Sequence, residues 1–182
     1  MTKSIQLLGL IAFLFAFNTE VNAQTLHEEM FEKFGTLTEW MNSPLINRYI
    51  VTNDELDQKF HGLLGETTLG TDKIIPLGKV VKGKNVILLY FVASYTAEGN
   101  LDFSSLHSAT LNKKTGEKTG FEKHLLAAGT RGTSRYNGSY KLKEKGVIVF
   151  SQNEVNIETD KETVTVKEYV FGKDLEYVQT ID

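Results

Sequence analysis

The histidines are the first side chains to examine, because imidazole binds metals and transfers protons near neutral pH. The chain has four: His27, His61, His107 and His124. None lies three or four residues from another, so the sequence lacks the local ligand pair that a metal site typically uses. The absence of cysteine also removes thiolate ligands and thiol nucleophiles. We therefore predict no metal centre and no cofactor.

Serine and acidic residues near His107 could supply the remaining members of a Ser–His–acid set: Asp102, Ser104, Ser105 and Ser108. Adjacent side chains point to opposite faces of a strand, so His107 points away from Leu106 and Ser108. No G-x-S-x-G motif is present to hold an exposed nucleophile on a sharp turn. Strand residues that make local hydrogen bonds are the favoured interpretation, and we predict no catalytic residues.

The stretch 128–140 (AGTRGTSRYNGSY) is the most distinctive polar segment, with three glycines and two of the three arginines. Arg131 and Arg135 could hold an anion through paired hydrogen bonds, and Tyr136 could stack on a sugar ring. These three residues are the predicted ligand-binding set. The alternative, which the composition favours, is a long hairpin loop with solvated arginines.

The end of the chain alternates between apolar and polar residues, which is typical of an antiparallel hairpin. A two-residue loop at Gly172 and Lys173 pairs Val170 with Leu175 and predicts one core face. That face comprises Val164, Val166, Val170, Leu175, Tyr177 and Ile181. Tyr169 and Phe171 then fall on the water-facing side. There they either lie under the N-terminal helices or form a partner-binding patch.

The N-terminus has the pattern of a secretory signal peptide. Lys3 precedes a short apolar segment at 5–17, and small residues flank a cleavage position after Ala23. We expect export, to the periplasm or the extracellular space. No later segment is long and apolar enough to cross a membrane as a helix. The net charge of −3 comes from interspersed charges, without the basic cluster that nucleic-acid binding requires.

The remaining residues, 24–182, suit a single globular domain with a mainly helical part at 24–72 and an antiparallel sheet at 73–182. Apolar spacing predicts helices at 25–41 and 53–64. The capping pattern T-N-D-E at 52–55 is expected to start the second helix, and Gly65 to end it before a loop at 65–72. The run 85–95 (NVILLYFVASY) predicts a central strand buried on both faces. Further strands are expected at 74–82 and 101–112, with a short one at 122–127. The expected fold is α+β, mainly β, with about six to eight strands in a meander that stays an open curved sheet or partly closes into a barrel.

The favoured function is a non-catalytic module of the bacterial envelope that binds a partner protein or a glycan. The surface would be one sheet face or the segment 128–140. The alternative is a small secreted hydrolase whose site is dispersed over several strands. Its candidate groups are Asp102, His107, Glu122 and His124. The sequence does not predict an oligomeric state.

Overall fold

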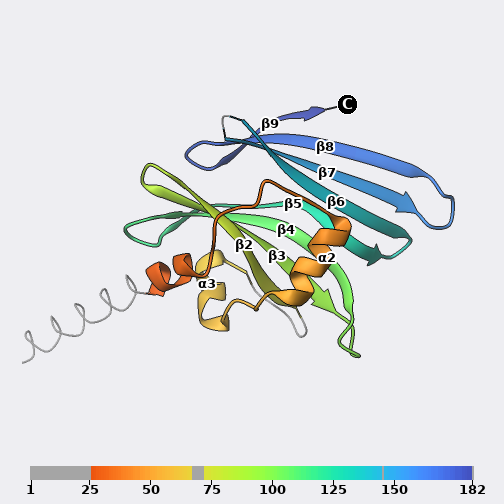
Figure 1. Ribbon diagram of the computed structural model, residues 1–182, viewed down its shortest axis with the longest axis horizontal. Coiled ribbons are helices and arrows are strands. Elements are labelled where there is room, and N and C mark those ends of the chain that lie inside the picture. Colours follow the sequence, from red (N-terminus) through yellow and green to blue (C-terminus); the bar gives the residue numbers. More distant parts are fainter. Residues whose placement is uncertain (1–25, 67–71, 145, 182) are drawn as a thin grey trace, which may run out of the picture.

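The computed structural model describes residues 26–66, 72–144 and 146–181, and the predicted signal peptide lies outside them. Within these residues the protein is mainly β, with short helices before the sheet (Figure 1). The predicted α+β, mainly β fold class is confirmed.

Eight strands form an antiparallel meander in sequence order. They are β2 (Lys73–Lys82), β3 (Asn85–Tyr95), β4 (Leu101–Asn112), β5 (Lys118–Arg131), β6 (Ser134–Lys143), β7 (Val147–Asn156), β8 (Glu162–Phe171) and β9 (Leu175–Ile181). The first and last strands, β2 and β9, are not paired with each other, so the sheet is open. The bounds of β3 and β4 are those predicted from the sequence.

The N-terminal part differs from the prediction. A helical segment at 26–32 ends before Gly35, and a short strand β1 (Trp40–Asn42) follows where one long helix was expected. Helix α2 (Ser43–Thr52) begins with Pro44 in its first turn, and the side chain of Asn42 accepts a hydrogen bond from Leu45 N–H. Proline suits a helix start because its missing N–H has no partner there.

The predicted helix at 53–64 is also wrong in its first half. Residues 53–57 are not helical, and only η1 (Gln58–Phe60) and α3 (His61–Leu64) form helical turns. Gly65 ends α3 with a φ of 74°, the left-handed conformation predicted for a glycine stop.

Strand β3 is buried on both faces, as its unbroken apolar run predicted. Val86, Leu88 and Tyr90 pack on one side with the 26–32 helix and α3. Ile87, Leu89, Phe91 and Ala93 pack on the other side with α2 and the later strands. The N-terminal helices therefore contribute to two cores, one on each side of β3, instead of covering a single face.

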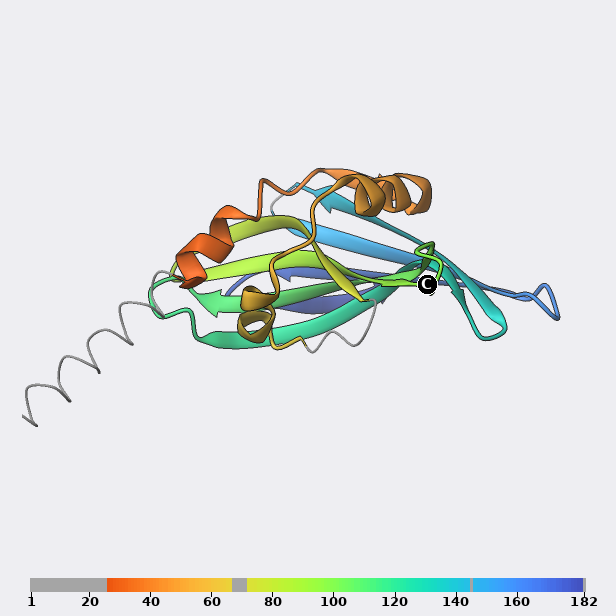
Figure 2. The ribbon, with the colours of Figure 1, turned by 90° about the horizontal axis from the view of Figure 1, so that it is seen from below.

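The sheet folds over on itself at the β5–β6 hairpin. These strands pair only where Ala128–Arg131 meet Ser134–Asn137, and the earlier part of β5 lies against β7 and β8 instead. The N–H of Leu126 donates to Gln152 Oε1 at 2.7 Å across this contact. We call β2–β5 the first leaf and β6–β9 the second leaf. Figure 2 shows the curvature that brings their inner faces together.

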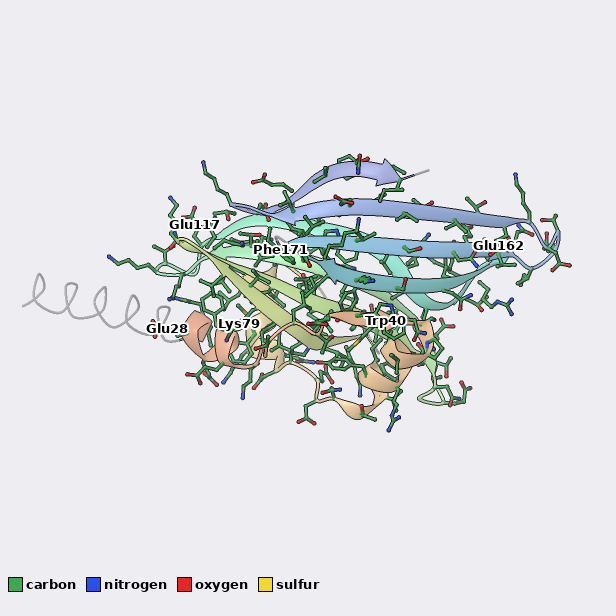
Figure 3. The ribbon with its side chains drawn as sticks, turned by 45° about the horizontal axis from the view of Figure 1, so that its top comes forward. Glu28, Trp40, Lys79, Glu117, Glu162 and Phe171 are labelled. Carbon is green, nitrogen blue, oxygen red and sulfur yellow. The ribbon has the colours of Figure 1, made fainter. Side chains whose placement is uncertain are left out.

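The last hairpin reverses the predicted core face. Phe171 pairs with Leu175 and Tyr169 with Tyr177, one residue away from the predicted register, and a bulge follows at Glu168. Tyr169 and Phe171 are 1 % and 5 % exposed, so they form part of the core and cannot serve as the predicted partner patch. Figure 3 shows Phe171 between the leaves and Glu162 near a projecting tip. The physical reason is that the first leaf covers the aromatic side of β8.

Candidate functional site

His107 connects the sheet to the segment that follows α3. On β4, His107 Nε2 lies 2.8 Å from Ser105 Oγ, and His107 Nδ1 lies 2.6 Å from Glu66 Oε1. Tyr90, on the neighbouring strand β3, donates its hydroxyl to the same Glu66 oxygen at 3.0 Å. The order serine–imidazole–carboxylate is that of a hydrolase triad.

The electrostatics of Glu66 fit this arrangement. Burial acts to raise the pKa of Glu66, but the hydrogen bond and charge of His107, together with Tyr90 and Lys118, outweigh it and lower the pKa. Burial and the neighbouring carboxylate raise the pKa of Tyr90. Glu66 is therefore ionised at neutral pH and holds two side chains of the first leaf.

Access argues against catalysis at Ser105, which is only 2 % exposed. A nucleophile must be reached by the substrate and must face donors for the developing oxyanion. Ser105 lies in the middle of β4, between β3 and β5, where it pairs with Val92 and Leu126. The cluster therefore works as a tether that fixes Glu66 to the sheet. Asp102, the acid considered from the sequence, is exposed on β4 and does not join it.

His124 forms a second cluster on the inner face of the first leaf. It is the extra residue of a β-bulge, since Lys123 pairs with His107 and Leu125 with Leu106. Its ring stacks on Phe150 at 4.6 Å and meets Tyr169 edge-on at 4.9 Å. The aromatic rings of the second leaf thus surround it.

The polar contacts of His124 are few. Its Nε2 lies 2.8 Å from Ser108 Oγ, and among the described residues its Nδ1 has no hydrogen-bond partner. The carboxylate of Glu122 lies 4.0 Å from that nitrogen and accepts instead from the Tyr169 hydroxyl at 2.8 Å. Burial, with smaller effects of His107 and Lys167, lowers the pKa of His124 to about 3, so the ring is neutral in the core.

Two pockets among the described residues leave the side chains of His107 and His124 buried. A pocket of about 350 Å³ lies between the 26–32 helix and residues 53–60 and does not include His107. A pocket of about 200 Å³ between the leaves includes His124 among its lining residues, but the His124 side chain is 0 % exposed. A reacting nitrogen must be reachable by the substrate, so the buried His124 ring is not placed to react from this pocket.

The predicted ligand-binding residues are not brought together. The stretch 128–140 is mostly strand, with only Gly132 and Thr133 between β5 and β6, so it is not a long loop. Arg131 lies over the ring of Phe103, with its guanidinium carbon 5.6 Å from the ring centre. Tyr136 donates to Glu154 at 3.3 Å. Arg135, next to Tyr136 on a strand, points to the opposite face.

The second leaf has a valine-rich outer face, and the strand register defines it. One row across the leaf runs Lys143, Val147, Val170 and Glu176, and the next runs Lys141, Val149, Glu168 and Gln179. Cross-strand partners share a face. Seven β-branched apolar residues therefore share this outer face: Val147, Val149, Val155, Val164, Val166, Val170 and Ile181.

The opposite side of the same strands is the core, where Ile148 and Phe150 are 0 % and 2 % exposed. On the outer face, Val164 is 59 % and Ile181 37 % exposed, and the other valines are half-buried among their neighbours. Figure 1 shows the helices grouped around the first leaf and β1, and no helix of the described residues lies over β7 or β8.

Charges border this outer face in a fixed order. Arg135, Lys141 and Lys143 lie on β6, at one side of the leaf. Glu162 and Glu168 on β8 and Glu176 on β9 lie at the other side. Lys143 Nζ reaches Glu168 at 2.9 Å within the leaf. The outer face is therefore positive along β6 and has Glu176 on β9. Between them, β7 and β8 present valines together with Ser151, Asn153, Glu162 and Glu168.

Comparison with known proteins adds no assignment: no family model, curated protein or solved structure matches the chain. Among the described residues, no helix is long and apolar enough to cross a membrane. The same residues contain no group of three or more potential ligands that could hold a metal ion.

Proposed function

We propose that the protein is an exported, non-catalytic interaction module that binds its partner through the outer face of the second leaf. The observation that supports this proposal is the set of seven β-branched side chains on a sheet face that no described helix covers. An apolar face of this kind in a soluble domain is typical of a protein-binding site. Export follows from the predicted signal peptide.

A site-specific photo-crosslinker tests the proposal in exporting cells. Placed at Val164, on the outer face, it should give an adduct with the bound partner. Placed at Val51, which is 66 % exposed on α2, it should give none. Equal adducts from both positions, or no adduct from Val164, would contradict an interaction through this face.

The second candidate is a small secreted hydrolase, which the Ser105–His107–Glu66 chain of hydrogen bonds favours. Its chemistry would be attack by Ser105 Oγ on an acyl carbon while His107 takes the hydroxyl proton. His107 would then give that proton to the leaving group as its bond to the acyl carbon breaks, and water would release the acyl group from Ser105. A fluorophosphonate probe, which reacts with activated serines, separates the candidates. The interaction proposal predicts no labelling of Ser105. Labelling that Ser105→Ala abolishes would favour the hydrolase.

A further inference from the structure

We infer that the partner of this outer face is a second copy of the chain, packed face to face about a two-fold axis that runs parallel to the strands. This inference rests on the proposed function, because it uses the same surface. It adds the identity of the partner and the geometry of the contact. It follows from the order of charges across the leaf.

A two-fold axis parallel to the strands reverses the strand order in the facing copy. Placed between β7 and β8, it sets β6 of one copy over β9 of the other, and β7 over β8. The row Lys143–Val147–Val170–Glu176 of one copy then faces the same row of the second copy, read in the opposite order. Lys143 meets Glu176 of the second copy, and Val147 meets Val170.

The other face-to-face arrangement is unfavourable. An axis perpendicular to the strands would place β6 over β6, and Arg135, Lys141 and Lys143 would meet the same positive charges. Like charges brought together at an interface cost several kcal/mol. The parallel axis instead places Lys143 over Glu176 and Lys141 over the neutral Gln179, so the charge pattern favours it.

One charged residue lies within the apolar part, and it already has a partner. Glu168 shares its row with Val149, and Lys143 Nζ lies 2.9 Å from its carboxylate. A buried carboxylate without a partner would oppose association, whereas a paired one is tolerated. The lysine has three donors, so it can hold Glu168 and also reach Glu176 of the second copy.

The size of the face suits a dimer. Four strands spaced about 4.8 Å apart, three of them ten residues long at about 3.3 Å per residue, present roughly 600 Å² before side-chain relief is counted. A stable interface buries about 800 Å² of accessible surface per partner. Two such faces packed in an aligned way form the core of an ordinary β-sandwich.

Charge exchange tests the geometry directly. Within one copy, Lys143 and Glu176 lie three strands apart, roughly 14 Å, so they do not form an ion pair. Across the proposed axis they form two pairs per dimer. Sedimentation equilibrium of the mature protein would measure the dimer dissociation constant for the parent, Lys143→Glu, Glu176→Lys and the double exchange.

We expect each single exchange to weaken the dimer tenfold or more. The double exchange should associate at least about threefold more tightly than either single exchange, but less tightly than the parent, because Glu168 has lost Lys143 as its partner. Lys113→Glu, the same change in the exposed turn after β4, should leave the dissociation constant unchanged. Thermal unfolding of each variant would show that the monomers remain folded.

Three results would overturn the inference. One is a parent that stays monomeric up to about 1 mM. A second is a dimer that neither single exchange weakens, and a third is a double exchange that associates no more tightly than the single exchanges. The crosslink from Val164 separates this failure from that of the proposed function. An adduct with a mass other than that of two chains would contradict the dimer but agree with an interaction through this face. The absence of any adduct would contradict both the dimer and the proposed function.

Discussion

Neighbouring positions on β7 offer a direct test of which side of the second leaf is the core. Phe150 is 2 % exposed, stacks on His124 at 4.6 Å and meets Tyr169 at 5.3 Å. Val149, one residue before it, is half-buried on the outer face. The substitutions Phe150→Ala and Val149→Ala remove apolar atoms at adjacent positions but from opposite faces.

The expected magnitudes differ severalfold. Replacing a buried phenylalanine by alanine costs about 3–5 kcal/mol, because apolar contact is lost and a cavity remains. Here the rings of His124 and Tyr169 would lose their packing partner, which places the loss at the upper part of that range. Val149→Ala removes two methyl groups that are only partly shielded in the monomer, so its cost should stay below about 1 kcal/mol.

Urea unfolding followed by circular dichroism measures both free energies, at a protein concentration low enough to keep the chain monomeric. Equal losses for the two variants, or a larger loss for Val149→Ala, would refute the assignment of the faces. If the slope of the unfolding free energy against urea concentration is the same in both variants, their unfolded states are comparable.

Three further predictions concern His124, Glu66 and the N-terminus. Because burial lowers the pKa of His124 from its usual value of about 6.5 to about 3, the unfolded chain binds a proton between these pH values that the folded chain does not bind. The free energy of unfolding should therefore fall by about 2 kcal/mol as the pH is lowered from about 7.5 to about 5. The variant His124→Gln should not show this part of the decrease. Parallel pH curves for the parent and the variant would contradict a neutral, buried ring. Glu66→Ala should cost about 2–3 kcal/mol in urea unfolding, because the buried His107 nitrogen and Tyr90 hydroxyl lose their acceptor, and a loss under about 0.5 kcal/mol would show that the tether is not structural. N-terminal sequencing of the exported protein should begin at Gln24, and a retained leader would contradict the cleavage expected after Ala23.

The sequence predicted most accurately what depends on local pattern. Strand β3 was predicted with its bounds because an unbroken apolar run without glycine or proline is typical of a strand buried on both faces. The stop at Gly65 was predicted because only a left-handed residue ends the helix there. The T-N-D-E capping pattern at 52–55 predicted a helix start that is not present. Asn42 and Pro44 start a helix earlier, and that helix ends at Thr52, where the pattern begins.

The last hairpin shows what local pattern cannot decide. Alternation along β8 separates Val164 and Val166 from Tyr169 and Phe171, but both sets are apolar, and only the position of the first leaf determines which one is buried. The bulge between Glu168 and Tyr169 also shifts the register, and no residue in the sequence marks it. The valine side was predicted as the core for this reason, and in the structure it faces outward.

The two histidine clusters depend on contacts that are distant along the chain. Glu66 reaches His107 across 41 residues, and the sequence offered Asp102 as the nearer acid. The same applies to His124 and Ser108, 16 residues apart, which meet because a bulge turns the imidazole inward. The only local sign in the sequence that Glu66 is held in place is its position directly after Gly65, which ends a helix.

The burial of Ser105 and His124 and the exposure of the valine face together favour interaction over catalysis. Both imidazoles have serine partners, but both are buried. His124 lies between the leaves, and His107 lies on the helix side of the first leaf against Glu66. The only part of the second leaf that combines an apolar centre with ordered charges is its outer face. No helix of the described residues covers that face.

Solvent paramagnetic relaxation of valine methyl groups tests this claim most directly. A soluble gadolinium chelate would be added to the methyl-labelled mature protein at low and at high protein concentration. We expect the methyl groups of Val149, Val164 and Val166 to become protected from the chelate as the protein concentration rises. The methyl groups of Val51 on α2 should stay accessible to it. Unchanged accessibility of the outer valines, or protection that appears only on α2, would contradict an interaction through the second leaf.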